Sequence, residues 1–198
     1  GSDLPMAAMC EYSAYHSYVF PQQAESVFSR GVMLDGLNER ELQRWKDRYY
    51  FLMQKLAYAT GKTQVLVRNA SDTARIPHLL SLFPNAKFVY IARDPYEMVR
   101  ATHERWESMC RLWSLQDYDL AVLHEQSFEF CEQLIRRYLN DRSKIPAGHL
   151  TQVRFEDLRD DPVGSMRQIY DDLAIAGGAD AALQWKIVAE TTTRSLAG

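Results

Sequence analysis

The chain has 198 residues, of which 46% are hydrophobic and 25% are charged, so it can bury one core of ordinary size. The formal net charge of -3 and a pI of about 6.0 argue against a nucleic-acid partner, although local arginines can still bind a small anion. No apolar run reaches the roughly 20 residues of a membrane span, and the N-terminus lacks the basic and then apolar order of a signal peptide.

The first part of the chain predicts mainly helices. Residues 6–15 are apolar and begin as a predicted helix, then pass into an aromatic, irregular stretch that continues to about Gly36. A loop of that length suggests a function. Asn38 and Glu41 form a capping box for a helix whose apolar residues recur at helical spacing until Gly61.

The middle of the chain predicts an α/β fold. Residues 64–68 (QVLVR) predict a short strand, and the helix after them buries Ile76, Leu79 and Phe83 before a second strand at 87–92. This order is a βαβ unit, which should be parallel and right-handed. The remaining predicted elements are a helix from Pro95, a helix over 117–139, a strand over 150–155, a helix from Asp161 and a helix over 179–191.

An arginine stands where the strand at 87–92 meets the next helix. Asp94 caps that helix, Pro95 suits its first position, and Glu97 can reach back to the cap. Arg93 therefore lies at the carboxyl end of a parallel strand, beside a helix N-terminus, where ligands bind and an anion is favoured. We predict a phosphate or sulfate site. The alternative is ordinary fold chemistry, with Arg93 paired to a surface carboxylate.

The cysteines give no sign of a disulfide framework or a metal site. Cys10, Cys110 and Cys131 are odd in number and widely spaced, as expected for reduced packing residues of a cytoplasmic protein. The histidines likewise lack metal-ligand spacing, so we expect no metal. No internal repeat or linker divides the chain, which predicts a single domain over residues 1–198.

Two long segments carry a family resemblance. VLVRNASDTARIPHLLSLFPNAKFVYIARDPYEMVRATHERW and QVRFEDLRDDPVGSMRQIYDDL resemble the central and C-terminal parts of a bacterial-type sulfotransferase, and PMAAMCEYSAYHSYVFP resembles a segment upstream of them. The resemblance extends from about Leu4 to Leu173. It implies 3′-phosphoadenosine 5′-phosphosulfate as the sulfuryl donor, and a P-loop-like, three-layer α/β sandwich with a short parallel sheet and many helices.

The resemblance assigns three residues to the donor. Arg93 matches the arginine that holds the 3′-phosphate, in agreement with the anion site inferred above. The family's serine on the following helix is Ala101 here, so the neighbouring Thr102 is the substitute hydroxyl. Phe155 matches the aromatic residue that packs near the adenine, and its alternative role is a core side chain.

Three further residues are candidates for catalysis. Arg68 matches a family lysine, and it can stabilise the sulfonate but cannot give up a proton. Asp72 is a candidate base if its pKa is raised, or else a helix cap. His16, in the aromatic stretch that would line the acceptor pocket, is the other candidate base, or else a packed or surface histidine.

One family feature has no counterpart in this sequence. Sulfotransferases of this type have a strand and a Ser-Gly-Thr-Thr loop that cradles the 5′-phosphosulfate, whereas Gly61, Lys62 and Thr63 follow a helix here. We therefore expect a chain that is incomplete on its N-terminal side, one that covers an exposed sheet edge with a second copy, or a degenerate relative.

The resemblance predicts transfer of a sulfuryl group to a hydroxyl or amine of a small-molecule or carbohydrate acceptor. The alternative is a truncated or degenerate relative that binds a nucleotide or a protein partner without catalysis. A nucleotide kinase is a weaker option, since the chain lacks a Walker-type lysine.

Overall fold

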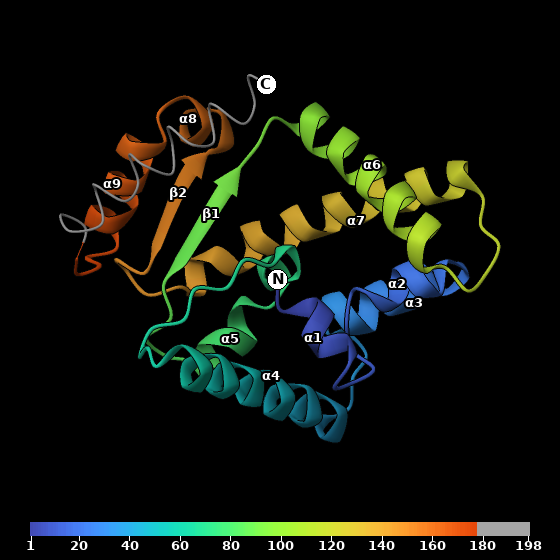
Figure 1. The fold of residues 1–198 in the computed structure, drawn as a ribbon, viewed down its shortest axis with the longest axis horizontal. Helices are drawn as coiled ribbons and strands as arrows, with labels where there is room; N and C mark the ends of the chain where they lie inside the picture. The colour runs from blue at the N-terminus through green and yellow to red at the C-terminus, as the bar shows by residue number, and fades with distance from the viewer. Residues whose placement is uncertain (178–198) are drawn as a thin grey trace. The chain divides into compact units, whose positions relative to one another are not determined.

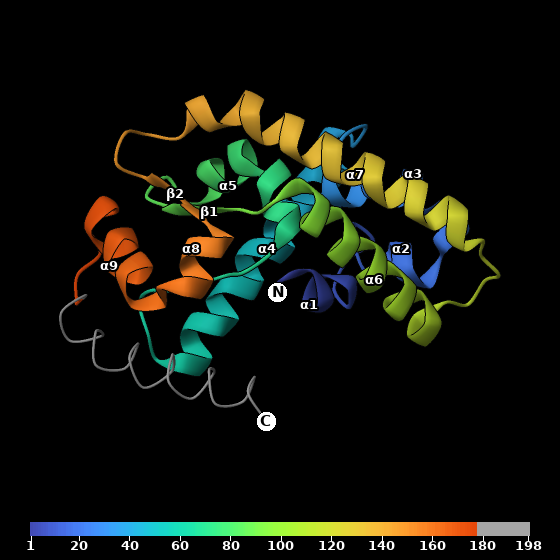
Figure 2. The ribbon, with the colours of Figure 1, turned by 90° about the horizontal axis from the view of Figure 1, so that it is seen from above.

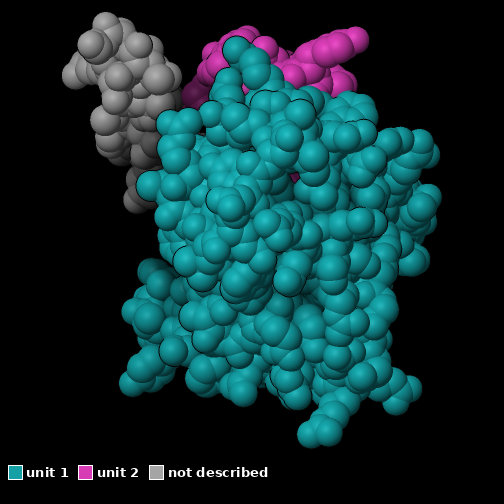
Figure 3. Space-filling view, turned by 90° about the vertical axis from the view of Figure 1, so that its right-hand side faces the viewer, with its two compact units in different colours: residues 1–84, 99–144 teal, residues 85–98, 145–198 magenta. Residues whose placement is uncertain are grey.

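The computed structural model describes residues 1–177, which fall into two compact units. Unit 1 comprises residues 1–84 and 99–144, and unit 2 comprises residues 85–98 and the chain from 145 onwards (Figure 3). Together they contain many helices and a short parallel sheet, so the predicted α/β class with dominant helices is confirmed.

The N-terminal segment of unit 1 differs from its prediction. The helix expected to begin at Met6 starts earlier, as α1 (Asp3–Ala7), and it ends at Ala7; the Ser13 hydroxyl then donates to the Asp3 carbonyl at 2.6 Å, which folds the chain back. The expected irregular stretch is confirmed for residues 8–15, but it is wrong for residues 16–32, which form short helical turns: α2 (His16–Val19), η1 (Pro21–Gln23), α3 (Ala24–Val27) and η2 (Phe28–Val32).

The helix predicted from Asn38 is confirmed as α4 (Glu39–Thr60). Its capping box is complete, because the Glu41 amide donates to Asn38 Oδ1 at 3.0 Å and the Asn38 amide donates to Glu41 Oε2 at 2.9 Å. Gly61 ends the helix in the left-handed conformation, with φ of 62°. The buried face of α4 carries Trp45, Tyr49 and Leu52.

The strand predicted at residues 64–68 is wrong, and so is the βαβ unit built on it. The segment is irregular, with Leu66 95% exposed, and no backbone hydrogen bond joins it to another segment of residues 1–177. A strand needs a hydrogen-bonded neighbour, which an apolar run cannot supply by itself. The chain continues through η3 (Ala70–Ala74) into α5 (Ile76–Leu82), the predicted helix.

Two long helices complete unit 1. α6 (Pro95–Trp113) begins in unit 2 and continues in unit 1, and α7 (Leu120–Asp141), which runs along α5 in Figure 2, is followed by η4 (Arg142–Lys144). Among the described residues, no helix is long and apolar enough to cross a membrane. The main core of the unit consists of Ala24, Phe28, Val32, Met33, Ala74, Trp106, Cys110, Leu123 and Phe130.

Unit 2 is a two-stranded parallel sheet with helices beside it. β1 (Phe88–Ala92) pairs with β2 (Leu150–Arg154) in the register Phe88↔Leu150 to Ala92↔Arg154, and α8 (Phe155–Asp160) and α9 (Pro162–Asp172) follow β2 (Figure 1). Both strands and the helix from Asp161 were predicted. The helix predicted over 179–191 lies outside the described residues. The core of the unit consists of Val153, Ile169 and Leu173.

Candidate functional site

Arg93 and Phe155 meet at the carboxyl end of the sheet in unit 2. Because the last paired residues are Ala92 and Arg154, Arg93 and Phe155 each come directly after the end of a strand. The Arg93 guanidinium carbon lies 4.6 Å from the centre of the Phe155 ring, within the range of a cation–π contact. The structure therefore brings together two of the three residues predicted for the donor.

The junction of β1 and α6 is held by carboxylates. Asp94 Oδ1 accepts the amides of Tyr96 at 3.0 Å and Glu97 at 3.1 Å, so Asp94 caps α6 as predicted. The Asp94 amide, which a capping box directs to Glu97, instead donates to Glu156 Oε1 at 3.0 Å. Glu97 Oε2 lies 3.6 Å from Arg93 Nη2, so the predicted surface ion pair of the arginine also exists.

The carboxylates near Arg93 are themselves engaged. The hydrogen bond from the Asp94 amide lowers the pKa of Glu156, whose Oε2 also lies 3.7 Å from Arg154 Nε. The Arg93 side chain is 31% exposed, and Glu97 Oε2, 3.6 Å from Arg93 Nη2, is beyond hydrogen-bond length. Its guanidinium thus lies over an aromatic ring and can still donate to a ligand.

Thr102, the third residue predicted for the donor, belongs to the part of α6 in unit 1. Its hydroxyl oxygen accepts a contact from the Cys131 thiol of α7 at 3.5 Å. Burial raises the pKa of Cys131, which keeps this thiol protonated and able to donate. The Thr102 hydroxyl therefore faces α7 within unit 1.

Asp72 lies in η3, and its carboxylate accepts from three donors. Oδ2 accepts from the Tyr49 hydroxyl at 2.9 Å, while Oδ1 accepts from Asn69 Nδ2 at 3.0 Å and Arg75 Nη1 at 3.3 Å. Burial raises the pKa of Asp72, and the Arg75 charge opposes that effect. The cap interpretation of Asp72 is wrong, because the residue whose side chain accepts from the Ser71 amide is Asn69.

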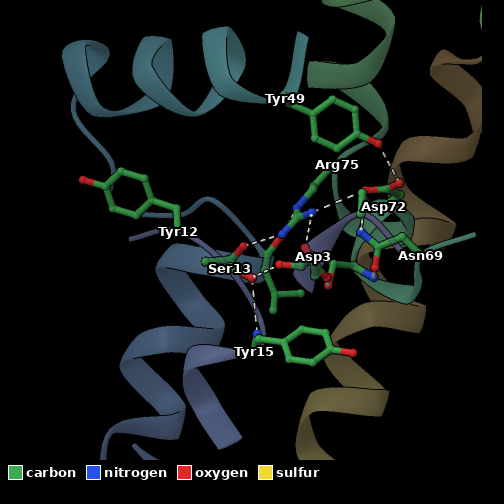
Figure 4. A network of polar contacts seen from close by, with 12 residues as sticks. Asp3, Tyr12, Ser13, Tyr15, Tyr49, Asn69, Asp72 and Arg75 are labelled. Atoms are coloured by element: carbon green, nitrogen blue, oxygen red, sulfur yellow. Dashed lines mark hydrogen bonds and ion pairs between the residues drawn. The ribbon is translucent and has the colours of Figure 1, made fainter. Parts of the chain in front are cut away.

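Arg75 is the centre of a buried polar network that sequence reasoning missed (Figure 4). Its side chain is fully buried, with Nη1 3.0 Å from Asp3 Oδ1 and Nε donating to the Val32 carbonyl at 3.1 Å. Nη2 donates to the Gly31 carbonyl, and the guanidinium lies 5.2 Å from the Trp45 ring centre. Apart from Asp72, these partners are distant in sequence, so no local pattern pointed to them.

His16 and Arg68 lie elsewhere in unit 1. His16 begins α2, and its Nδ1 is 3.1 Å from the Glu11 carbonyl oxygen. Arg68 is exposed in the irregular segment before η3. Within residues 1–177, no hydrogen bond or ion pair joins any two of His16, Arg68 and Asp72, so the three predicted catalytic residues do not form a bonded constellation.

Aromatic residues lie close to His16 in the sequence. The Tyr15 ring lies 5.6 Å from the Tyr18 ring and 6.2 Å from the Trp113 ring, and the Tyr18 ring lies 5.2 Å from the Trp106 ring. Burial raises the pKa of Tyr18 to about 12, so its hydroxyl stays neutral at physiological pH. Unit 1 thus holds a group of packed aromatic rings, two of which belong to residues close to His16 in the sequence.

The cysteines are free, with Cys10 and Cys110 buried and Cys131 half-buried. In the part of the chain that the structure describes, no group of three or more His, Cys, Asp or Glu side chains is arranged to hold a metal ion.

Comparison with known proteins places the chain in a family. The profile of the Sulfotransferase family matches residues 11–176. The omega-hydroxy-beta-dihydromenaquinone-9 sulfotransferases Stf3 of Mycobacterium bovis and Mycobacterium tuberculosis are each 29% identical to the chain over 163 residues, which are 82% of the chain and 42% of each relative. The chain thus spans well under half the length of these relatives. No solved structure matches it. Because the family profile covers most of the sequence, the chain belongs to the sulfotransferase family.

Proposed function

We propose that this chain carries the 3′-phosphoadenosine-binding part of a sulfotransferase that uses 3′-phosphoadenosine 5′-phosphosulfate, with Arg93 holding the 3′-phosphate and Phe155 lying near the adenine. The observation that supports this most strongly is the stacking of the two side chains at 4.6 Å. They were selected separately by the resemblance, and they are 62 positions apart in the sequence.

The contacts of Arg93 suit a phosphate. The Arg93 guanidinium lies over the Phe155 ring, and the N–H donors at its edge remain available for bidentate bonds. The ion pair with Glu97 is long, at 3.6 Å, and the Glu97 side chain is 47% exposed. Such a pair contributes at most about 1 kcal/mol, so a phosphate can replace Glu97 as the partner of Arg93.

For the acceptor we propose a hydroxyl group on a largely apolar small molecule. The relatives are named for an omega-hydroxy menaquinone. The rings of Tyr15, Tyr18 and Trp113 supply apolar surface close to His16 in the sequence and in unit 1. Such surface suits an apolar carrier better than a polar carbohydrate.

For the base we favour His16 over Asp72. A carbonyl oxygen can only accept, so the Glu11 carbonyl holds the proton on His16 Nδ1 and leaves the lone pair of Nε2 to receive the proton of the acceptor hydroxyl. Asp72 has a raised pKa but already accepts from three donors, which suits a structural role. Arg68 is exposed and is proposed to stabilise the sulfonate.

Isothermal calorimetry with 3′-phosphoadenosine 5′-phosphate tests the donor site. We expect binding by the wild-type chain, loss of at least tenfold in affinity in Arg93→Ala, and no change in the control Arg159→Ala. Arg159 is a suitable control because it lies in the same unit, is 63% exposed and pairs with Asp160. Absence of binding at millimolar ligand, or equal loss in both variants, refutes the donor site.

A radiolabelled sulfate-transfer assay with a long-chain primary alcohol tests turnover. If the chain binds the nucleotide but transfers no sulfate, the alternative of a non-catalytic, nucleotide-binding relative is supported. If it transfers sulfate, we expect His16→Gln to lower kcat by about 100-fold and Asp72→Asn to lower it much less.

The same proposal includes the layer architecture of the fold, the cellular location and the oligomeric state. We propose a three-layer, P-loop-like sandwich and a cytoplasmic setting in a bacterium. A second copy that covers the sheet edge is supported by β1, which pairs with β2 alone within the described residues and exposes Val89 (37%) and Ile91 (45%). Sedimentation equilibrium, compared between wild type and Ile91→Lys, measures that association.

A further inference from the structure

Beyond the last paired residues, the ends of β1 and β2 are joined by a side chain. The ladder stops at Ala92 and Arg154, and the chain then enters α6 on one side and α8 on the other. The Asp94 amide donates across this gap to Glu156 Oε1 at 3.0 Å. Glu156 is therefore the link between the start of α8 and the start of α6.

This link lies next to the stacked pair. Arg93 precedes Asp94 and Phe155 precedes Glu156, so the hydrogen bond joins the two residues that follow the stack. A shift of α6 relative to α8 would separate the guanidinium from the ring, because each is held by the backbone next to this bond.

We propose that Glu156 is a positioning residue of the donor site, which holds the Asp94 amide against the start of α8 and thereby keeps the Arg93 guanidinium over Phe155 and directed at the 3′-phosphate. This inference rests on the proposed function. Glu156 makes no contact with the nucleotide in this scheme. It acts through Arg93, and it requires an acceptor oxygen at that position rather than a negative charge.

The arrangement explains how a carboxylate can stand at a phosphate site. A free carboxylate would repel the ligand, but Glu156 is engaged by the Asp94 amide and lies 3.7 Å from Arg154 Nε. The amides of Tyr96 and Glu97 donate to Asp94 Oδ1 and are therefore not free to bind the ligand. Few amides of the first turn are then left for the ligand, so its phosphate depends mainly on Arg93.

The decisive comparison is between Glu156→Ala and Glu156→Gln. Glutamine retains an acceptor oxygen, so we expect Glu156→Gln to bind 3′-phosphoadenosine 5′-phosphate within threefold of wild type, and Glu156→Ala to bind about tenfold more weakly. The matched control is Glu97→Gln, which removes the ion pair of Arg93 but keeps the hydrogen bond between the Asp94 amide and Glu156. This variant should bind the nucleotide as well as wild type or better. Wild-type affinity in Glu156→Ala, or an equal loss in Glu156→Gln, overturns the proposal.

A second measurement needs no ligand. In wild type and Glu156→Gln, we expect slow hydrogen exchange of the Asp94 amide and an Arg93 Nε–H resonance shifted by the Phe155 ring current, and in Glu156→Ala we expect both to be lost. Identical spectra in wild type and Glu156→Ala overturn the positioning role. The spectra of wild type and Glu156→Ala can differ as expected while the wild-type chain binds no nucleotide. In that case the proposed donor function is wrong, but the role of Glu156 in positioning Arg93 is supported.

Discussion

Arg75 Nη1 lies 3.0 Å from Asp3 Oδ1, and this ion pair joins residues 72 positions apart in the interior of unit 1. The Arg75 side chain is 0% exposed, so its charge depends on its protein partners instead of water. Removing one member of such a pair leaves the other charge buried without compensation.

Arg75→Ala should therefore destabilise the chain by about 3–5 kcal/mol, measured as the free energy of unfolding in urea. The matched control is Arg44→Ala, because Arg44 pairs with Glu11 at 2.7 Å with both side chains about half exposed. We expect that control to cost at most about 1 kcal/mol. Equal losses in both variants would contradict the structural role of the buried network.

Phe155→Leu should weaken the binding of 3′-phosphoadenosine 5′-phosphate by about three- to tenfold, since leucine removes the aromatic face under Arg93. Phe155→Tyr should bind as wild type. Phe51→Leu is the matched control, because Lys55 Nζ lies 5.4 Å from the Phe51 ring centre in unit 1, far from the donor residues in sequence. Calorimetry measures all three, and unchanged affinity in Phe155→Leu would assign Phe155 to packing alone.

His103→Gln should reduce the fall in the free energy of unfolding as the pH is lowered below about 6.5. The His103 and His124 rings of α6 and α7 are stacked with centres 4.4 Å apart, and both Nε2 atoms are buried without a hydrogen-bond partner among the described residues. Burial, and then His124, lower the pKa of His103 in the folded chain. The unfolded chain therefore binds a proton at higher pH than the folded chain does, and stability present above about pH 6.5 is lost as the pH falls.

The measurement is urea unfolding of wild type and His103→Gln between pH 8 and pH 5. The difference in unfolding free energy between the two should shrink or reverse in favour of the variant as the pH falls. A difference that is constant with pH would show that His103 takes up no additional proton on unfolding.

Asn38→Ala should lower the free energy of unfolding by about 1 kcal/mol, because the Glu41 amide loses its acceptor at the start of α4. Asn38→Ser retains a side-chain oxygen and should lose only a few tenths of that amount. Thermal unfolding at one pH compares the three proteins, and equal melting temperatures for all would mean that water replaces the cap at no cost.

Features governed by neighbouring residues were predictable from the sequence. The capping box of Asn38 and Glu41, the Asp94 cap and the strand before Arg93 all depend on side chains within four positions of the backbone they bind. By contrast, the apolar run at 64–68 predicts a strand that the structure does not contain. A strand forms only beside a hydrogen-bonded neighbour, and the hydrophobic pattern of one segment does not say whether such a neighbour exists.

Long-range features were predictable only in part. The burial of Arg75 depends on Asp3 and on the carbonyl groups of Gly31 and Val32, which no local pattern links to it. The resemblance selected Arg93 and Phe155, whose guanidinium and ring are in contact, and their roles stay predictions. So do the roles of His16, Arg68, Asp72 and Thr102, and the single domain expected over residues 1–198.

The register of β1 and β2 has a consequence for how this chain can vary. Since Ala92 is paired with Arg154, the positions of Arg93 and Phe155 are set by two five-residue strands, independently of the length of the chain between them. Insertions in the connection from α6 to α7 would leave the pair aligned, whereas deletion of one residue within β2 would turn every later side chain of that strand to the opposite face. The segments between the strands can therefore change in length while Arg93 and Phe155 remain side by side.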